Sequence, residues 1–541
     1  MSYASGFAET PLIGWTIGDQ LERTTERFPD HDALVDMPTG RRWTYHEFDD
    51  AVTALATGLL ALGIDKGDRV GILAVNVPEW VLAQYATAKI GAILVNINPA
   101  YRTHELAYVL RHAGISMLIS ASGFKSSDYV AMIEQIRPEI PALREVVILG
   151  SSDWDTLAET IPDRAAVSAR SAELDRDDPI NIQYTSGTTG SPKGATLTHH
   201  NILNNGFFVT EVQQFTEADR ICVQVPFYHC FGMVLANIGA MTHGSCVVIP
   251  SPSFDPAASL AAIEAERCTA LYGVPTMFIG ILEHPDFAKA DLSSLRTGVV
   301  SGSPCPLEYM KRLVDDMHLK DITIAYGMTE TSPISTHTRI DASMERRTST
   351  VGTPLPHVEV KIIDPGTGRT VPRGTTGELC TRGYLVMNGY WNEPEKTADA
   401  MDAHGWMHSG DLATMDDEDY VNIVGRCKDM VIRGGENIYP REIEEFLYIH
   451  PDVADVQVIG VPDPKYGEEL CAWIRMRPGT TALTAQTLRE FCAGKIAHYK
   501  IPRYVRVADE FPMTASGKIR KVALREQSVR ELDLDDTAAT A

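Results

Sequence analysis

The chain has 541 residues, of which 44% are hydrophobic and 22% charged, and its formal net charge is −24. This length predicts two or more domains, and the acidic balance argues against nucleic acid as a partner. No apolar run approaches the ~20 residues that span a bilayer, and Met1 to Thr10 has no signal-peptide pattern. The nine cysteines are scattered, with no Cys-x-x-Cys pair and no His/Cys cluster at zinc spacing, which predicts reduced thiols in a cytoplasmic protein.

Two stretches show the same alternation of short apolar strands and amphipathic helices. The first has strands at Gly71–Asn76, Ile93–Asn98 and Ser116–Ser122 and helices at Pro78–Ala92 and His104–Gly114. The second has strands at Ile221–Val225, Ser245–Pro250 and Ala270–Val274 and helices at Phe231–Gly244 and Asp255–Thr269. Such alternation predicts parallel sheets covered by helices on both faces. Two doubly wound subdomains are expected, and one continuous large sheet is the alternative.

The pattern changes near Val351. Short alternating segments at Thr353–Asp364, Thr376–Gly383 and Tyr420–Gly425 predict a small β-rich subdomain. A compact α/β segment follows, with strands near Asp455–Val461 and Leu470–Arg475 and helices near Pro440–Ile449 and Thr487–Ile496. We therefore expect an N-terminal domain over residues 1–426 and a C-terminal domain over residues 427–541.

A segment rich in glycine and hydroxyl side chains follows the strand-like run from Ile180 to Tyr184. Glycine lets backbone N–H groups turn toward an anion, hydroxyls add donors, and lysine adds a positive charge. It is not a Walker loop, since both Gly-Lys pairs of the chain are followed by isoleucine. A flexible Ser/Gly loop is the simpler alternative. The residues predicted to hold a polyphosphate are Thr185, Ser186, Gly187, Thr188, Thr189, Gly190, Ser191, Pro192 and Lys193.

Two further segments carry groups suited to a nucleotide. In Tyr326-Gly327-Met328-Thr329-Glu330-Thr331, the tyrosine ring can stack on a purine, Thr329 can bond a phosphate, and Glu330 is a hard oxygen ligand for Mg²⁺. In His408-Ser409-Gly410-Asp411, the aspartate can accept hydrogen bonds from both ribose hydroxyls. Each segment alone is also compatible with an ordinary turn.

Taken together, these segments resemble the adenylate-forming enzymes, which include acyl-CoA synthetases, the adenylation domains of peptide synthetases and firefly-type luciferases. The resemblance covers nearly the whole chain, with the motifs in family order. It implies an α/β fold: a large N-terminal domain of two doubly wound sheets plus a small β-rich subdomain, followed by a small mobile α+β C-terminal domain. The strings Asp178–Gln183, His229-Cys230 and Lys428–Asn437 are most similar to those of medium-chain fatty acyl-CoA synthetases.

The resemblance also implies roles for individual residues around ATP. Tyr326, after which Gly327 allows a tight turn, would pack on adenine, whose other wall would be the turn Gly302, Ser303 and Pro304. Thr329 would contact the α-phosphate and Glu330 would hold magnesium. Asp411 would bind the ribose, and Arg426 would reach the ribose and phosphate region.

Four more positions or segments match parts of the family pattern that serve catalysis and acyl transfer. Lys428 matches the hinge of the small domain, and Gly434, Gly435 and Glu436 match the loop that admits the pantetheine arm of coenzyme A. Pro512–Ile519 matches the catalytic-lysine segment, in which Lys518 would bridge the attacking carboxylate and the α-phosphate. His229 matches an aromatic gate between the acyl pocket and the thiol, although a histidine beside aromatics is more often a core residue.

The resemblance therefore implies an ATP-dependent CoA ligase for a fatty acid, with Mg²⁺ as cofactor and coenzyme A as co-substrate. An acyl-AMP ligase that loads a carrier protein, or a CoA ligase for a branched or aryl acid, is the alternative. A non-catalytic nucleotide-binding protein predicts degraded motifs, which are absent, and nothing indicates the luciferin pocket of an oxygenase. The oligomer, monomer or homodimer, is not predicted.

Overall fold

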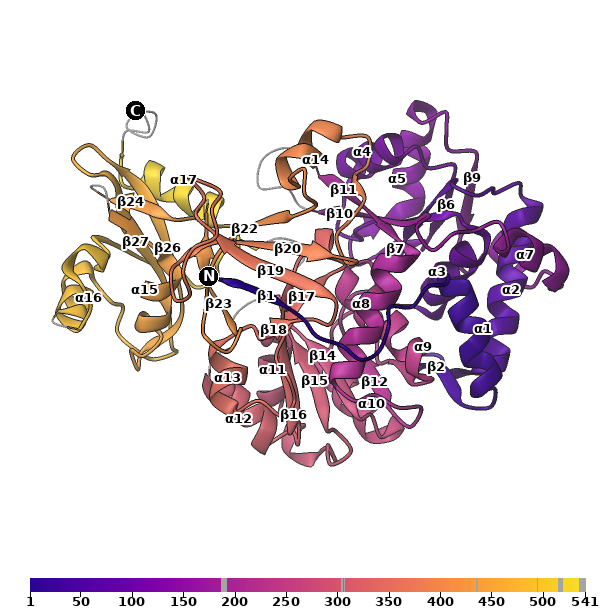
Figure 1. The fold of residues 1–541 in the computed structure, drawn as a ribbon, viewed down its shortest axis with the longest axis horizontal. Helices are drawn as coiled ribbons and strands as arrows, with labels where there is room; N and C mark the ends of the chain where they lie inside the picture. The colour runs from indigo at the N-terminus through magenta and orange to yellow at the C-terminus, as the bar shows by residue number, and fades with distance from the viewer. Residues whose placement is uncertain are drawn as a thin grey trace.

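The computed structural model describes residues 1–534 except 186–191, 303–304, 306, 428, 434–435, 494 and 514–518, and it does not describe the side chains of residues 432, 436 and 437. Two large helix-covered sheets form the body of the molecule, and a separate small α/β unit lies at one end (Figure 1). A smaller sheet, which belongs to the β-rich part of the chain, lies between the body and this unit.

The first large sheet has the order β21-β11-β10-β5-β4-β6-β9. Its inner strands are parallel, whereas β11 and β21 run antiparallel at one edge. The strands are β4 (Arg69–Leu73), β5 (Ile93–Asn96), β6 (Met117–Ser120), β9 (Glu145–Ile148), β10 (Pro179–Thr185), β11 (Lys193–Thr198) and β21 (Gly389–Tyr390). The helices in this part of the chain are α1 (Ile17–Arg27), α2 (Tyr45–Ala61), α3 (Pro78–Ile90), α4 (Thr103–Ala113), α5 (Tyr129–Ile136), α6 (Ser152–Ala158) and α7 (Arg164–Ser171).

The second large sheet has the order β18-β17-β16-β15-β14-β12-β13-β2-β3. Its strands are β2 (Asp32–Asp36), β3 (Arg41–Thr44), β12 (Arg220–Val223), β13 (Cys246–Ile249), β14 (Ala270–Gly273), β15 (Thr297–Val300), β16 (Asp321–Gly327), β17 (Ile334–His337) and β18 (Thr353–Pro354). Its helices are α8 (His199–Val212), α9 (Gly239–His243), α10 (Pro256–Glu266), α11 (Pro275–Leu282), α12 (Leu307–Asp315) and α13 (Met344–Ser349). The hairpin β2–β3, from the start of the chain, completes this sheet.

Local sequence explains the ends of the helices between these strands. Pro78 begins α3, and Gly91 ends it in the left-handed conformation at φ 73°, as expected for a proline at the first turn and a glycine after the last. Thr198 caps α8 through a reciprocal pair of hydrogen bonds with Asn201. Both predicted alternations of strand and helix are confirmed within a few residues, and they form two sheets in the described chain rather than one.

The predicted helix from Phe231 to Gly244 differs in kind. Its first part, η2 (Phe231–Ile238), is a π-helix, and only α9 is α-helical. The π-helix is fully buried and belongs to the main hydrophobic core, together with residues of α2, α3 and α8 and strands of both sheets. π-Helical geometry within helices is rare and occurs frequently at functional sites.

The β-rich sheet has the order β1-β19-β20-β22-β23. These strands are β1 (Tyr3–Ser5), β19 (Val358–Ile363), β20 (Gly377–Gly383), β22 (Met407–Met415) and β23 (Val421–Arg426). Three of them match the predicted segments; β1 and β22 were not predicted as strands. The helix α14 (Pro394–Ala400) lies between β21 and β22 in the chain.

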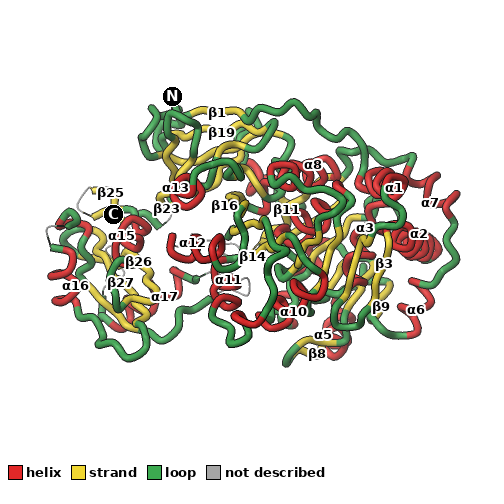
Figure 2. Tube along the Cα trace, turned by 90° about the horizontal axis from the view of Figure 1, so that it is seen from below, coloured by secondary structure: helices red, strands yellow, loops and turns green. Residues whose placement is uncertain are grey.

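The small unit begins after β23. Its strands are β24 (Val431–Arg433), β25 (Glu436–Ile438), β26 (Val453–Asp463), β27 (Gly467–Met476) and β28 (Tyr504–Val507), and its helices are α15 (Pro440–Leu447), α16 (Ala485–Cys492) and α17 (Lys521–Glu531). These elements have their own buried core, which includes Val456, Ala472 and Leu488. Figure 2 shows the unit beside the larger body from a second direction.

Among the described residues, no helix combines the length and the apolar character that crossing a membrane requires. All nine cysteines lie in the described part of the chain, and none forms a disulfide.

Candidate active site

Neighbouring parallel strands of the second sheet end at one edge, where ligands of open α/β sheets bind. Strand β15 leads into Ser301 and Gly302, and its neighbour β16 ends at Tyr326 and Gly327. The Ser301 hydroxyl donates a hydrogen bond of 2.8 Å to the carbonyl of Ala325, which ties the two strand ends together. Gly302 has φ +89°, a conformation that favours glycine. Ser303 and Pro304 lie outside the described residues.

Tyr326, Asp411 and Arg426 form one hydrogen-bonded set. The Tyr326 hydroxyl donates to Asp411 Oδ2 at 2.5 Å, and Arg426 Nε donates to Asp411 Oδ1 at 3.1 Å. Asp411 and Arg426 face each other across strands β22 and β23. Burial, reinforced by the Asp411 charge, raises the pKa of Tyr326 well above its usual range, so this hydroxyl remains a donor. The structure thus brings Asp411 together with Tyr326, 85 positions before it, and Arg426, 15 positions after it.

The turn after Tyr326 requires glycine. A Cβ on Gly327 would lie 1.7 Å from the carbonyl oxygen of Pro333, so no side chain fits there. The turn leads into the short 3-10 helix η4 (Thr329–Thr331), in which Glu330 is only 6% exposed. Glu330 Oε1 accepts a hydrogen bond of 2.7 Å from the hydroxyl of Tyr390. A carboxylate is thus fixed near the strand ends.

The predicted phosphate loop connects the antiparallel strands β10 and β11. Thr185 and Lys193 are paired across these strands, and residues 186 to 191 lie outside the described residues. The Tyr108 hydroxyl donates to the Pro192 carbonyl at 3.2 Å. The Lys193 ammonium lies 4.7 Å from the centre of the Tyr390 ring. Tyr390 therefore contacts both the lysine at the end of the loop and the carboxylate of Glu330.

His229 lies just before the π-helix and is partly buried. Its Nδ1 accepts a hydrogen bond of 3.2 Å from the backbone N–H of Phe231. The adjacent Cys230 thiol is buried and donates to Gln183 Oε1 at 3.1 Å. Burial raises the pKa of Cys230, and a hydrogen bond with the Thr329 side chain opposes that rise. The beginning of the π-helix therefore lies against the Thr329 segment.

Several predicted residues lie outside the described residues: Ser186 to Ser191, Lys428, Gly434, Gly435 and Lys518. Glu436 is described only as a backbone position in β25, paired with Arg433. A β-bridge between Met513 and Ile519 flanks the segment that contains Lys518.

Two residues of this region had no predicted role. Tyr390 belongs to the two-residue strand β21, which pairs with β11, and Gln183 lies on β10 beside Cys230. Neither residue belongs to a recognisable sequence motif, because their contacts depend on strand pairings that only the fold defines.

Comparison with protein families gives two matches. Residues 21–391 match the family described as AMP-binding enzyme, and residues 442–518 match the AMP-binding enzyme C-terminal domain.

Relatives align over nearly the whole chain. The protein named acyl-CoA synthetase YngI from Bacillus subtilis is 48% identical, over 97% of this chain and 99% of its own. The mitochondrial medium-chain acyl-CoA ligase ACSF2 of Danio rerio is 44% identical, over 98% and 91%.

Solved structures agree in fold. The anthranilate CoA ligase AuaEII in complex with anthranoyl-AMP has a TM-score of 0.86 at 28% identity, covering 97% of this chain and 99% of that one. ATP-bound MatB from Rhodopseudomonas palustris has a TM-score of 0.82 at 30% identity, covering 94% and 99%. The chain is therefore a member of the AMP-binding enzyme family.

Proposed function

We propose that this protein is an AMP-forming acyl-CoA ligase that activates a fatty acid with ATP and transfers the acyl group to coenzyme A. The observation that carries the proposal is the hydrogen-bonded set of Tyr326, Asp411 and Arg426 at the strand ends. Relatives at 48% and 44% identity over almost all of the chain bear the names of acyl-CoA synthetases or ligases.

In this proposal the ATP site is built from the groups described above. Asp411 accepts hydrogen bonds from the ribose hydroxyls, with Arg426 beside it, and the Tyr326 ring packs on adenine opposite the turn at Gly302. The phosphate loop, which ends at Lys193, holds the β- and γ-phosphates. Thr329 contacts the α-phosphate.

Glu330 suits a magnesium ion. It is a nearly buried carboxylate, and its Oε1 accepts a hydrogen bond from the Tyr390 hydroxyl. Oxygen is the ligand that Mg²⁺ prefers. When bound, the ion would neutralise phosphate charge. The residues of the chain hold and orient the substrates.

Two half-reactions follow. A carboxylate oxygen of the fatty acid attacks the α-phosphorus of ATP, and pyrophosphate leaves. Lys518 offsets the repulsion between the two anions and stabilises the charge that develops at phosphorus. The CoA thiol then loses its proton and attacks the acyl carbonyl, and AMP leaves. In this proposal His229 acts as the gate between the acyl pocket and the approach of the thiol.

The proposal divides the chain into domains of residues 1–426 and 427–541 that rotate about Lys428. The family models match residues 21–391 and 442–518, on either side of this position. Strand β23 ends at Arg426 in one sheet, and β24 begins at Val431 in another. Rotation would withdraw Lys518 and bring the Gly434-Gly435 loop to the site, so that one site performs two reactions.

Lys428→Pro is expected to slow thioester formation by about 10²-fold, because proline fixes φ at about −65° where the hinge has to change it. Adenylate formation should stay close to wild type. Pyrophosphate release and acyl-CoA formation, measured separately, test this. Lys428→Ala is the matched control, because it removes the same side chain and keeps the backbone free. Normal thioester turnover by the proline variant would contradict the hinge assignment.

Tyr390→Phe is expected to weaken binding of the divalent cation by about 10- to 10²-fold, since a hydrogen bond to a charged group contributes about 1.5–3 kcal/mol. The ring, and with it the contact to Lys193, remains. Electron paramagnetic resonance of Mn²⁺ with a non-reactive ATP analogue measures the affinity. Tyr420→Phe is the control, because it makes the same substitution at a tyrosine whose ring packs against Arg346. Unchanged Mn²⁺ affinity in Tyr390→Phe would show that this hydroxyl does not position Glu330.

A medium-chain fatty acid is the substrate that the proposal favours, because of the relatives named for that activity. An aryl acid is the alternative substrate, because one protein of similar fold is named as an anthranilate CoA ligase. A carrier protein in place of CoA is the alternative acceptor. A screen over carboxylates from C2 to C18 and aryl acids, in which pyrophosphate release is measured with CoA, with a carrier protein and with neither, tests both points. Turnover only with aryl acids, or only with a carrier protein, would refute this assignment.

A further inference from the structure

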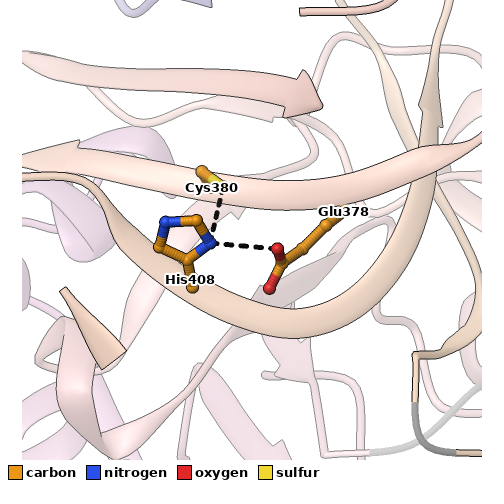
Figure 3. Close-up of side chains that lie close together, drawn as sticks. All are labelled: Glu378, Cys380 and His408. Carbon is orange, nitrogen blue, oxygen red and sulfur yellow. Dashed lines mark hydrogen bonds and ion pairs between the residues drawn. The ribbon is translucent and has the colours of Figure 1, made fainter. Parts of the chain in front are cut away.

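A carboxylate, a thiol and an imidazole meet beneath the turn that carries Asp411. Glu378 and Cys380 lie on strand β20, and His408 lies on the neighbouring strand β22, paired with Cys380. Figure 3 shows the imidazole pointing toward both other groups. His408 Nδ1 is 3.0 Å from Glu378 Oε2 and 3.7 Å from Cys380 Sγ. This cluster was not predicted, because the sequence contains no Cys/His spacing typical of zinc.

An irregularity in strand pairing creates the cluster. Glu378 and Cys380 are two positions apart on β20. Their partners on β22, Leu412 and His408, are four positions apart, so β22 has extra residues at this point. Such a bulge bends a strand and redirects its side chains. The extra residues include Gly410, whose φ is +70°.

The distances fit the coordination of zinc. Tetrahedral Zn²⁺ has ligands at about 2.3 Å for sulfur and about 2.0–2.2 Å for nitrogen and oxygen, which places sulfur and nitrogen about 3.6 Å apart and nitrogen and oxygen about 3.3 Å apart. The observed separations of 3.7 Å and 3.0 Å differ from these by a few tenths of an ångström. All three ligand atoms lie within 4.8 Å of one another.

The surroundings also suit a bound cation. Glu378 Oε1 accepts a hydrogen bond of 3.1 Å from the backbone N–H of Gly410, which orients the carboxylate from outside the cluster, as in metal sites. Cys380 is buried, whereas the side chains of Glu378 and His408 are 13% and 30% exposed, so a cation can enter from their side.

We propose that Glu378, Cys380 and His408 form a binding site for a thiophilic divalent cation, Zn²⁺. A thiolate with an imidazole selects zinc over magnesium, so the site is distinct from the one at Glu330. Binding would displace the thiol proton of Cys380. The cation would replace the hydrogen bond between His408 and Glu378 and tie β20 to β22 directly below the Gly410-Asp411 turn. The proposal does not depend on the proposed function.

Titration of the full-length, metal-free protein with Co²⁺ tests this, because only thiolate ligation gives the intense charge-transfer absorption. We expect one Co²⁺ per chain with that absorption, displaced by Zn²⁺. Cys380→Ser should abolish the absorption. His408→Gln should weaken binding by at least about 10²-fold, since even residues behind the ligands contribute 10–100-fold.

Cys427→Ser is the matched control, because Cys427 is a second thiol whose pKa is raised by burial and by the Glu378 charge. It should keep the absorption. Absence of the absorption in folded wild-type protein would overturn the proposal and leave Glu378 and His408 as a structural hydrogen bond. Absorption that survives Cys380→Ser, or that is lost instead in Cys427→Ser, would overturn it as well. Circular dichroism of each variant shows whether it is folded.

Discussion

Lys518→Ala is expected to slow formation of the acyl-adenylate by about 10²–10³-fold, the usual effect of removing one donor that stabilises a transition state. Thioester formation from supplied acyl-adenylate should remain close to wild type. The two rates should respond differently because the lysine bridges the carboxylate and the α-phosphate in the first half-reaction and is withdrawn before the second. Single-turnover measurements of the two halves separate these effects.

The control for this prediction is Lys495→Ala, which removes an exposed positive charge from the same C-terminal unit. Both halves should then proceed at wild-type rates. If Lys518→Ala slows both halves equally, the lysine does not act in adenylation alone, and the proposed alternation of the small domain loses its basis.

Asp411→Ala is expected to lower kcat/KM for ATP by at least about 10²-fold. The variant removes the acceptor for the ribose and leaves the Tyr326 hydroxyl and the Arg426 guanidinium without the carboxylate that they share. Hydrogen bonds to a charged group contribute about 1.5–3 kcal/mol each, and two of them correspond to about 10²-fold or more.

Calorimetric binding of AMP gives a test that does not depend on turnover. Asp411→Ala should bind AMP more weakly by a similar factor, whereas Tyr326→Phe, which keeps the ring and loses one hydrogen bond, should lose about tenfold. Wild-type affinity for AMP in Asp411→Ala would show that this carboxylate does not bind the nucleotide.

The sequence predicted those parts of the fold that depend on local patterns. Continuous apolar strands such as Ile93–Asn96 and helices bounded by Pro78 and Gly91 follow from residue type and spacing alone. It did not predict that β2 and β3, near the start of the chain, would complete the sheet whose other strands begin at Arg220. Such long-range pairing leaves no local signal.

The candidate site shows the same division. Tyr326, Glu330 and Asp411 lie in glycine-containing turns whose order along the chain is informative, and the structure links Tyr326 to Asp411. Tyr390 and Glu378 were missed because their significance comes from neighbouring strands: Tyr390 contacts Glu330 and Lys193, and Glu378 meets His408 through a bulge. The π-helix was predicted as an α-helix because a buried helix of either kind is apolar on all sides, so the sequence pattern does not separate them.

The most direct test of the proposed function follows oxygen from the acid. Octanoate labelled with ¹⁸O in both carboxylate positions is incubated with ATP, Mg²⁺ and CoA, and the products are analysed by mass spectrometry. Attack of the carboxylate on the α-phosphorus predicts octanoyl-CoA, unlabelled pyrophosphate and AMP that carries one ¹⁸O atom. Label in inorganic phosphate, with ADP as the other product, or failure to form a thioester with CoA from any fatty acid, would contradict the assignment of this protein as an AMP-forming acyl-CoA ligase.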